Sequence, residues 1–186
     1  MTLQTAAPLP RLSMSTTNRP MDTLLHWADN HNSLDMDQPY QRGHVWGLTR
    51  RRNLIRSIIM GIPIPSLIVN DRMGAKFSEP TYDQDRNWAY AIIDGKQRTT
   101  TIIMWLRSEF AVPASWFGPD LVSTPEPTTD GIYVRFSGLT IPAQRGMRNR
   151  TIGVAEGKFG TLTEERMVFD LVNFGGLAQG ERDTDA

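Results

Sequence analysis

The run Asp94-Gly95-Lys96-Gln97-Arg98 gathers a carboxylate, an amine, a carboxamide and a guanidinium into five residues. It follows the apolar residues 91–93 and precedes a helical pattern, which predicts a strand, a polar turn and then a helix. Helix N-termini present unpaired N–H groups and partial positive charge. With Lys96 and Arg98 beside such a terminus, the run predicts an anion pocket whose guest is a phosphate.

An ordinary exposed turn is the alternative, because Asp-Gly commonly joins a strand to a helix and charged residues are common in solvated turns. Thr99, Thr100 and Thr101 would then cap the next helix, and Asp94 would cap its own turn. If the run is functional, Asp94 is the candidate ligand for a divalent cation, since Mg²⁺ bound to phosphates needs few protein carboxylates.

A second informative segment lies upstream. It contains Tyr40-Gln41-Arg42 and Trp46, and it continues into a predicted helix whose apolar positions are 54, 55, 58 and 59. Thr49 is the expected N-cap and Gly61 the expected stop. The prolines at 63 and 65 favour extended backbone leading into a strand at 66–69.

These blocks together resemble the N-terminal domain of GmrSD-type restriction proteins, in the ParB/sulfiredoxin-like superfamily. The matching motifs are Pro-Tyr-Gln-Arg, a Trp, a helix ending in Gly-Ile-Pro-Ile-Pro, and then Ile-Asp-Gly-Lys-Gln-Arg-Thr-Thr. A third block, residues 167–177 with Asn173, is followed by Glu181. The resemblance covers roughly residues 20–182. The family often has Gln where this chain has Lys96, and lysine retains a donor while adding charge.

The resemblance implies a domain that binds a nucleoside triphosphate with Mg²⁺ and hydrolyses it in connection with DNA restriction. It implies catalytic roles for Asp94, Gln97 and Arg98, with Asp94 also holding the metal. The implied nucleotide- and phosphate-binding residues are Tyr40, Gln41, Arg42, Gly95, Lys96, Thr99 and Asn173.

Two other functions remain open. The first is a DNA-binding or adaptor module without catalysis, which would act with a separate nuclease subunit or a host restriction component. Arg50, Arg51 and Arg52 would then contact DNA, although a run of arginines is also typical of a solvated helix face. The second is a domain that itself nicks DNA. We expect no C-terminal nuclease domain within 186 residues, which favours the adaptor module as a stand-alone version from a phage or mobile element.

Composition favours a compact domain. Of the 186 residues, 39% are hydrophobic and 22% are charged, and the formal net charge is zero. A neutral chain is a poor candidate for coating DNA by bulk attraction. The absence of cysteine excludes disulfides and zinc-thiolate sites. With no apolar stretch of membrane-spanning length and no signal-peptide pattern, we expect a cytoplasmic protein without membrane contact.

The predicted fold class is α+β, a small mixed sheet with packed helices. We expect a flexible arm over residues 1–20, one domain over 21–182 and a tail over 183–186. Helices are predicted at 21–28, 99–107, 141–150 and 162–174, the last capped by Thr161 or Thr163 and ended by Gly175-Gly176. Strands are predicted at 131–136 and 151–155. Residues 71–87 are expected to form a hairpin-like excursion or a long loop, and residues 111–130 are expected to be irregular.

Overall fold

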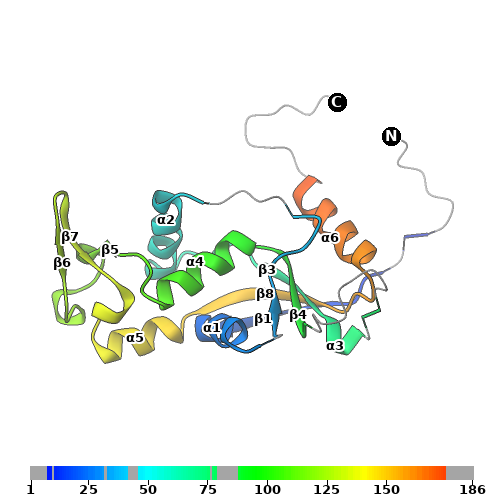
Figure 1. The fold of residues 1–186 in the computed structure, drawn as a ribbon, viewed down its shortest axis with the longest axis horizontal. Helices are drawn as coiled ribbons and strands as arrows, with labels where there is room; N and C mark the ends of the chain where they lie inside the picture. The colour runs from blue at the N-terminus through cyan, green and yellow to red at the C-terminus, as the bar shows by residue number, and fades with distance from the viewer. Residues whose placement is uncertain are drawn as a thin grey trace, which may run out of the picture.

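The computed structural model describes residues 8–9, 11–31, 33–41, 46–75, 77–78 and 88–174. Within them, helices pack on a mixed five-stranded sheet, and a separate three-stranded sheet lies at the far end of the molecule from the last helix (Figure 1). This arrangement confirms the predicted α+β class. The more specific ParB/sulfiredoxin-like fold stays a prediction.

The large sheet has the strand order β1-β8-β3-β4-β2. Its strands are β1 (Met14–Pro20), β8 (Thr151–Gly157), β3 (Leu67–Asp71), β4 (Tyr90–Asp94) and β2 (Leu34–Asp35). Neighbouring strands alternate between antiparallel and parallel pairing, from β1 with β8 to β4 with β2. β3 and β4 lie inside this sheet, so the turn that follows β4 is held on a rigid support.

Strand β1 corrects the expected flexible arm over residues 1–20. All seven of its residues pair with β8, from Met14 opposite Gly157 to Pro20 opposite Thr151. Its side chains are mostly exposed, so the strand has no apolar alternation for a sequence pattern to reveal. Backbone pairing across the sheet edge, and an Arg19–Glu156 ion pair at 2.5 Å, hold it instead.

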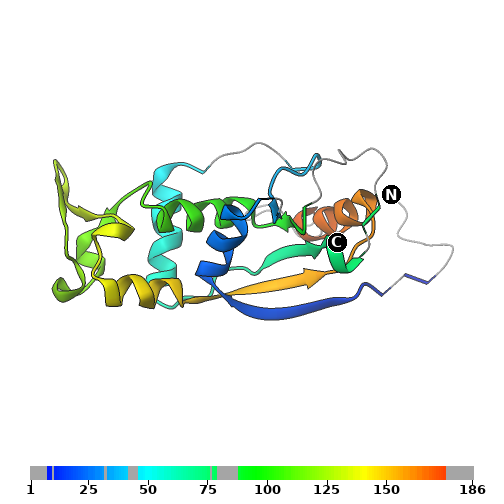
Figure 2. The same ribbon diagram turned by 60° about the horizontal axis from the view of Figure 1, so that its bottom comes forward.

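Three helices build the main core above the large sheet in Figure 2: α1 (Met21–Asp29), α2 (Leu48–Ile59) and α4 (Lys96–Leu106). α1 and the apolar face of α2 confirm the predicted helices. The N-cap of α2 is Gly47 and no side chain caps it, so Thr49 is not the cap. Gly61 follows the helix with φ of 73°, as its role as a stop requires.

Helix α6 (Leu162–Phe174) covers β4 from the other side. Successive strand side chains point to opposite faces, and accordingly Ile92 joins the main core whereas Ile93 packs with Phe159 and Val168. This two-sided burial explains why the middle of β4, residues 91–93, is apolar. The expected cap of α6 is confirmed, since Thr161 Oγ1 accepts a hydrogen bond from the N–H of Glu164 at 3.2 Å.

Residues 111–134 form the small antiparallel sheet, in the order β5 (Val112–Pro113), β7 (Gly131–Val134) and β6 (Glu126–Thr128). The expectation of an irregular segment over 111–130 missed β5 and β6, because strands of two and three residues give no periodic pattern. α5 (Ile141–Arg148) then leads into β8. Residues 72–75 form the short helix α3 (Arg72–Ala75). None of the helices in the described ranges is long and apolar enough to span a bilayer.

Candidate functional site at the β4–α4 turn

Gly95 forms the turn between β4 and α4 and has two reasons to be glycine. Its φ is 95°, in the left-handed region, and a Cβ added there would lie 2.4 Å from Leu67 Cδ2. The helix begins immediately afterwards, at Lys96 rather than at Thr99. The threonines therefore do not cap it: Thr99 is fully buried, and Thr101 Oγ1 donates back to the Gln97 carbonyl at 2.7 Å.

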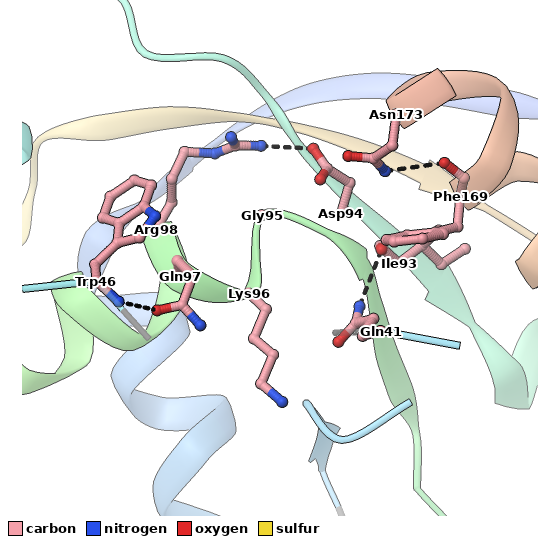
Figure 3. Close-up of a pocket in the computed structure, with 10 residues that line it drawn as sticks. All are labelled: Gln41, Trp46, Ile93, Asp94, Gly95, Lys96, Gln97, Arg98, Phe169 and Asn173. Carbon is pink, nitrogen blue, oxygen red and sulfur yellow. Dashed lines mark hydrogen bonds and ion pairs between the residues drawn. The ribbon is translucent and has the colours of Figure 1, made fainter. Parts of the chain in front are cut away.

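A pocket of about 360 Å³ opens at this turn, and Figure 3 shows its residues. Predicted site residues from three distant segments reach it: Gln41 from the upstream block, the turn residues 94–98, and Asn173 from α6. Tyr40 and Thr99 do not line it. We call it the turn pocket. Its lining residues are Gln41, Trp46, Ile93, Asp94, Gly95, Lys96, Gln97, Arg98, Phe169 and Asn173.

Both cations of the turn are ion-paired. Arg98 Nη2 contacts Asp94 Oδ2 at 2.7 Å and donates to the Ser66 carbonyl at 3.2 Å. Lys96 Nζ contacts Asp37 Oδ1 at 2.7 Å, but the Asp37 side chain is 80% exposed. An exposed partner is easily replaced, because solvent screens the pair. Lys96 is thus the cation more available to an incoming anion.

Two glutamine amides in the pocket have fixed and opposite orientations. Gln41 Nε2 donates to the carbonyls of Ile92 at 2.7 Å and Ile93 at 3.0 Å. Gln97 Oε1 accepts the backbone N–H of Trp46 at 3.1 Å, which leaves its Nε2 as a donor with no partner among the described residues. Among the described residues, Gln41 therefore retains an unused acceptor, its buried Oε1, and Gln97 retains an unused donor.

Tyr40 faces away from the pocket lining and belongs to a buried polar cluster, the Glu165 network. Its hydroxyl donates to Glu165 Oε2 at 3.1 Å. Burial, and then the charge of Glu165, raise the pKa of the Tyr40 phenol far above its usual range, so the hydroxyl stays protonated. Tyr40 also contacts Phe169, with ring centroids 5.3 Å apart. It supports the pocket through that ring.

The Glu165 network centres on an ion pair with Arg72. Arg72 Nε and Nη2 donate to the two Glu165 oxygens, each at 2.8 Å, and Arg72 Nη1 pairs with Asp35 at 2.9 Å. Burial alone lowers the pKa of Arg72, but the bonds and charge of Glu165 and Asp35 outweigh that effect and raise it. The other members are Gln38, Tyr40 and Asn70.

The three arginines predicted to contact DNA lie in three different environments. Arg51 is buried, and its Nε donates to the Trp46 carbonyl at 2.9 Å while Nη1 contacts the sulfur of Met104. Arg52 donates to the Ala111 carbonyl at 2.9 Å. Only Arg50 of the three is exposed, with its guanidinium 4.6 Å from the centre of the Trp46 ring. Arg51 thus positions Trp46, which in turn orients Gln97.

No group of three His, Asp or Glu side chains gathers as a metal site in the described ranges. Asp94 is the single carboxylate lining the pocket, and its pairing with Arg98 through Oδ2 leaves Oδ1 without a hydrogen bond from any described residue. One carboxylate oxygen suffices for Mg²⁺ that arrives already bound to phosphates and waters. Asp94 therefore fits a Mg²⁺ ion that is also coordinated by the phosphates of a ligand. It does not form a metal site by itself.

No site role was predicted from the sequence for four residues that lie in or beside the pocket. These are Trp46, Ile93, Phe169 and Asp37. Phe169 could have been predicted from the sequence, because it lies four residues before Asn173 and therefore on the same face of the predicted helix. Asp37 had none, since its contact with Lys96 spans 59 residues. The buried Glu165 was detectable as a charge on the same helix stripe as Val168. Arg42, His44 and Glu181 lie outside the described residues.

This site, a strand-turn-helix with anion-compatible donors on an α+β domain, belongs to a chain that matches one protein family. The family model for the GmrSD restriction endonuclease N-terminal domain matches residues 24–176. The chain is therefore a member of the GmrSD N-terminal domain family, and the predicted resemblance is confirmed. Searches of curated proteins and of solved structures found no match.

Proposed function

We propose that the turn pocket binds a nucleoside triphosphate together with Mg²⁺ and hydrolyses it, in a protein associated with DNA restriction. One observation carries the proposal: three segments far apart in sequence bring Gln41, the turn residues and Asn173 to a single pocket at the start of α4. In an ordinary solvated turn, polar residues from segments so far apart in sequence would not be expected to line one pocket with the turn residues. The family membership supports the restriction context.

The phosphates lie at the start of α4 in this proposal. The first N–H groups of a helix have no acceptor within the helix, and a helix N-terminus favours negative charge. Lys96 and Gln97 line the pocket there, and Figure 3 shows both side chains extending away from the Arg98 guanidinium. A triphosphate displaces exposed Asp37 from Lys96, which exchanges one carboxylate for a more highly charged anion.

Hydrolysis at this site works by charge stabilisation and placement. Asp94 would hold Mg²⁺ through the oxygen that Arg98 leaves open, and the metal would supply neutralisation of phosphate charge. Gln97 orients the phosphate or the attacking water through Nε2. Arg98 keeps Asp94 in position through its ion pair at 2.7 Å.

The direct test measures inorganic phosphate released from each of the four nucleoside triphosphates with Mg²⁺, with and without duplex DNA. We expect release by the wild type and a loss of at least about tenfold in Asp94→Ala and Arg98→Ala. Asp29→Ala, which breaks only an exposed pair with Arg107, serves as the control and should leave release unchanged. No release, and no rise in melting temperature with any triphosphate, contradicts the proposal.

A second candidate is a DNA-binding or adaptor module that acts with a separate nuclease, and one feature favours it. Arg50 is exposed and stacked on Trp46, at the edge of the turn pocket, where it could contact a phosphate backbone. A salt-dependent gel shift that Arg50→Ala weakens would support this candidate. Arg51→Ala is unsuitable for that test, because its buried guanidinium holds Trp46.

A further inference from the structure

Gln41 carries an acceptor that nothing in the described structure satisfies. Both hydrogens of its Nε2 are committed to the carbonyls of Ile92 and Ile93, and its buried Oε1 has no hydrogen-bond partner among the described residues. Rotating the amide by half a turn would place the oxygen against those two carbonyls, so the orientation is fixed. A buried acceptor without a donor is unfavourable, and a ligand N–H can relieve it.

The surroundings of this acceptor suit a flat, partly apolar group. Phe169 and Ile93 line the pocket beside Gln41, and the Phe169 ring is steadied by its tilted contact with Tyr40. Figure 3 shows the Phe169 ring next to Ile93 with Gln41 close by, while Gln97 and Lys96 extend from the start of α4. The pocket thus has an apolar end with one acceptor and a polar end with donors.

We infer that Gln41 Oε1 reads the nucleobase, accepting an N–H from the base edge while the ring of Phe169 covers the base. This inference rests on the proposed function, because it assumes that the phosphates of the same ligand lie at the start of α4. The inference adds a claim that the proposed function does not contain. It states that the base contributes to affinity through a single fixed acceptor. An aromatic ring beside a polar atom is a common way to hold a base.

The test compares nucleotides that differ only in the base donor, using calorimetric titration with Mg²⁺ present. The matched pairs are ATP with purine riboside triphosphate, CTP with pyrimidin-2-one riboside triphosphate, and UTP with its N3-methyl analogue. Inorganic tripolyphosphate reports on the phosphate end alone. For at least one pair we expect the analogue to bind about three- to tenfold more weakly, the value of one hydrogen bond.

Gln41→Met removes the acceptor and keeps the length of the side chain. In this variant we expect the gap within the pair to fall below about twofold, while tripolyphosphate binds as it does to the wild type. Equal binding within all three pairs overturns the inference, as does a gap that persists in Gln41→Met. If the variant fails to fold, the wild-type comparison still decides. Failure of tripolyphosphate and all nucleotides to bind would overturn the proposed function instead.

Discussion

The Glu165 network and the turn pocket are both polar and are neighbours, since Tyr40 belongs to the network and Gln41 lines the pocket. Their hydrogen bonding differs. In the network, Glu165 is fully buried and accepts four bonds, from Tyr40, from Asn70 and twice from Arg72. In the pocket, Gln41 Oε1 and Arg98 Nε are buried and have no hydrogen-bond partner among the described residues. The first region is complete without a ligand, and the second is not.

This difference in hydrogen bonding indicates which of the two polar clusters is the ligand site. Buried charges are stable only when paired and hydrogen-bonded, so a satisfied network serves the fold. It joins the 35–40 segment, β3, α3 and α6, and thereby holds Phe169 and Asn173 over the pocket. Unsatisfied groups cost stability and are tolerated where a ligand completes them. Four predictions test this division.

Glu165→Ala should have the largest effect. It removes the carboxylate that accepts two hydrogen bonds from buried Arg72, and we expect a loss of about 3 to 5 kcal/mol in unfolding free energy. Urea denaturation measures it. The control on the same helix is Asp170→Ala, which breaks an exposed pair with Arg166 at 3.7 Å and should cost less than about 0.5 kcal/mol. Equal effects of the two changes would remove the distinction.

Gly95→Ala tests whether the turn itself is under constraint. The left-handed φ and the contact with Leu67 should together cost about 1 to 3 kcal/mol in unfolding free energy, because an L side chain is strained there. Gly146→Ala is the matched control: it lies in α5 with open space around it and should stabilise by about 0.5 to 1 kcal/mol. Thermal melts of both variants give the comparison, and a neutral Gly95→Ala would contradict it.

Lys96 and Asp37 test the pocket without disturbing the fold. Lys96→Ala should weaken triphosphate binding about tenfold, whereas Asp37→Asn should strengthen it by releasing the lysine. Both should leave the unfolding free energy within about 0.5 kcal/mol of the wild type, because the pair is exposed. Calorimetric titration measures the affinities. Opposite signs are the expected signature, and two changes in the same direction would argue against an anion at Lys96.

Tyr40→Phe should have the smallest effect, about 1 kcal/mol at neutral pH, from loss of one hydrogen bond to Glu165. The phenol pKa is raised in the folded protein above its usual value of 10.0. Its contribution to stability is therefore present below pH 10 and is lost as the pH rises further, because only the unfolded chain releases that proton. Denaturation at several alkaline pH values should show less loss of stability in Tyr40→Phe than in the wild type.

The sequence predicted most of the fold and the centre of the site. The apolar periodicity of α1, α2 and α6 and the strand-turn-helix at Gly95 were readable because each is local. β1 was missed because its stability comes from pairing with β8, 137 residues away at the Arg19–Glu156 contact. The Glu165 network was missed for the same reason, since its members adjoin only after folding.

Local pattern also assigned some residues the wrong partners. Arg50, Arg51 and Arg52 looked alike in sequence, but the helical rotation of 100° per residue sends them to different surroundings. Arg51 points into the structure and holds Trp46, whereas Arg50 stays exposed. The start of α4 was placed three residues late because Gly95 can begin a helix without any side-chain cap. That shift moves Lys96, Gln97 and Arg98 from a loop into the first turn.

Hydrogen–deuterium exchange with and without an Mg²⁺–nucleoside triphosphate complex tests the central claim most directly, because it reports where a ligand binds. We predict slower exchange at the amides of residues 95–99 and around Phe169, with no change in β5, β6 and β7 at the far end of the molecule (Figure 1). Lys96→Ala should reduce that protection. Protection confined to any other region, or absent with all four triphosphates, would contradict a nucleotide site at the turn pocket.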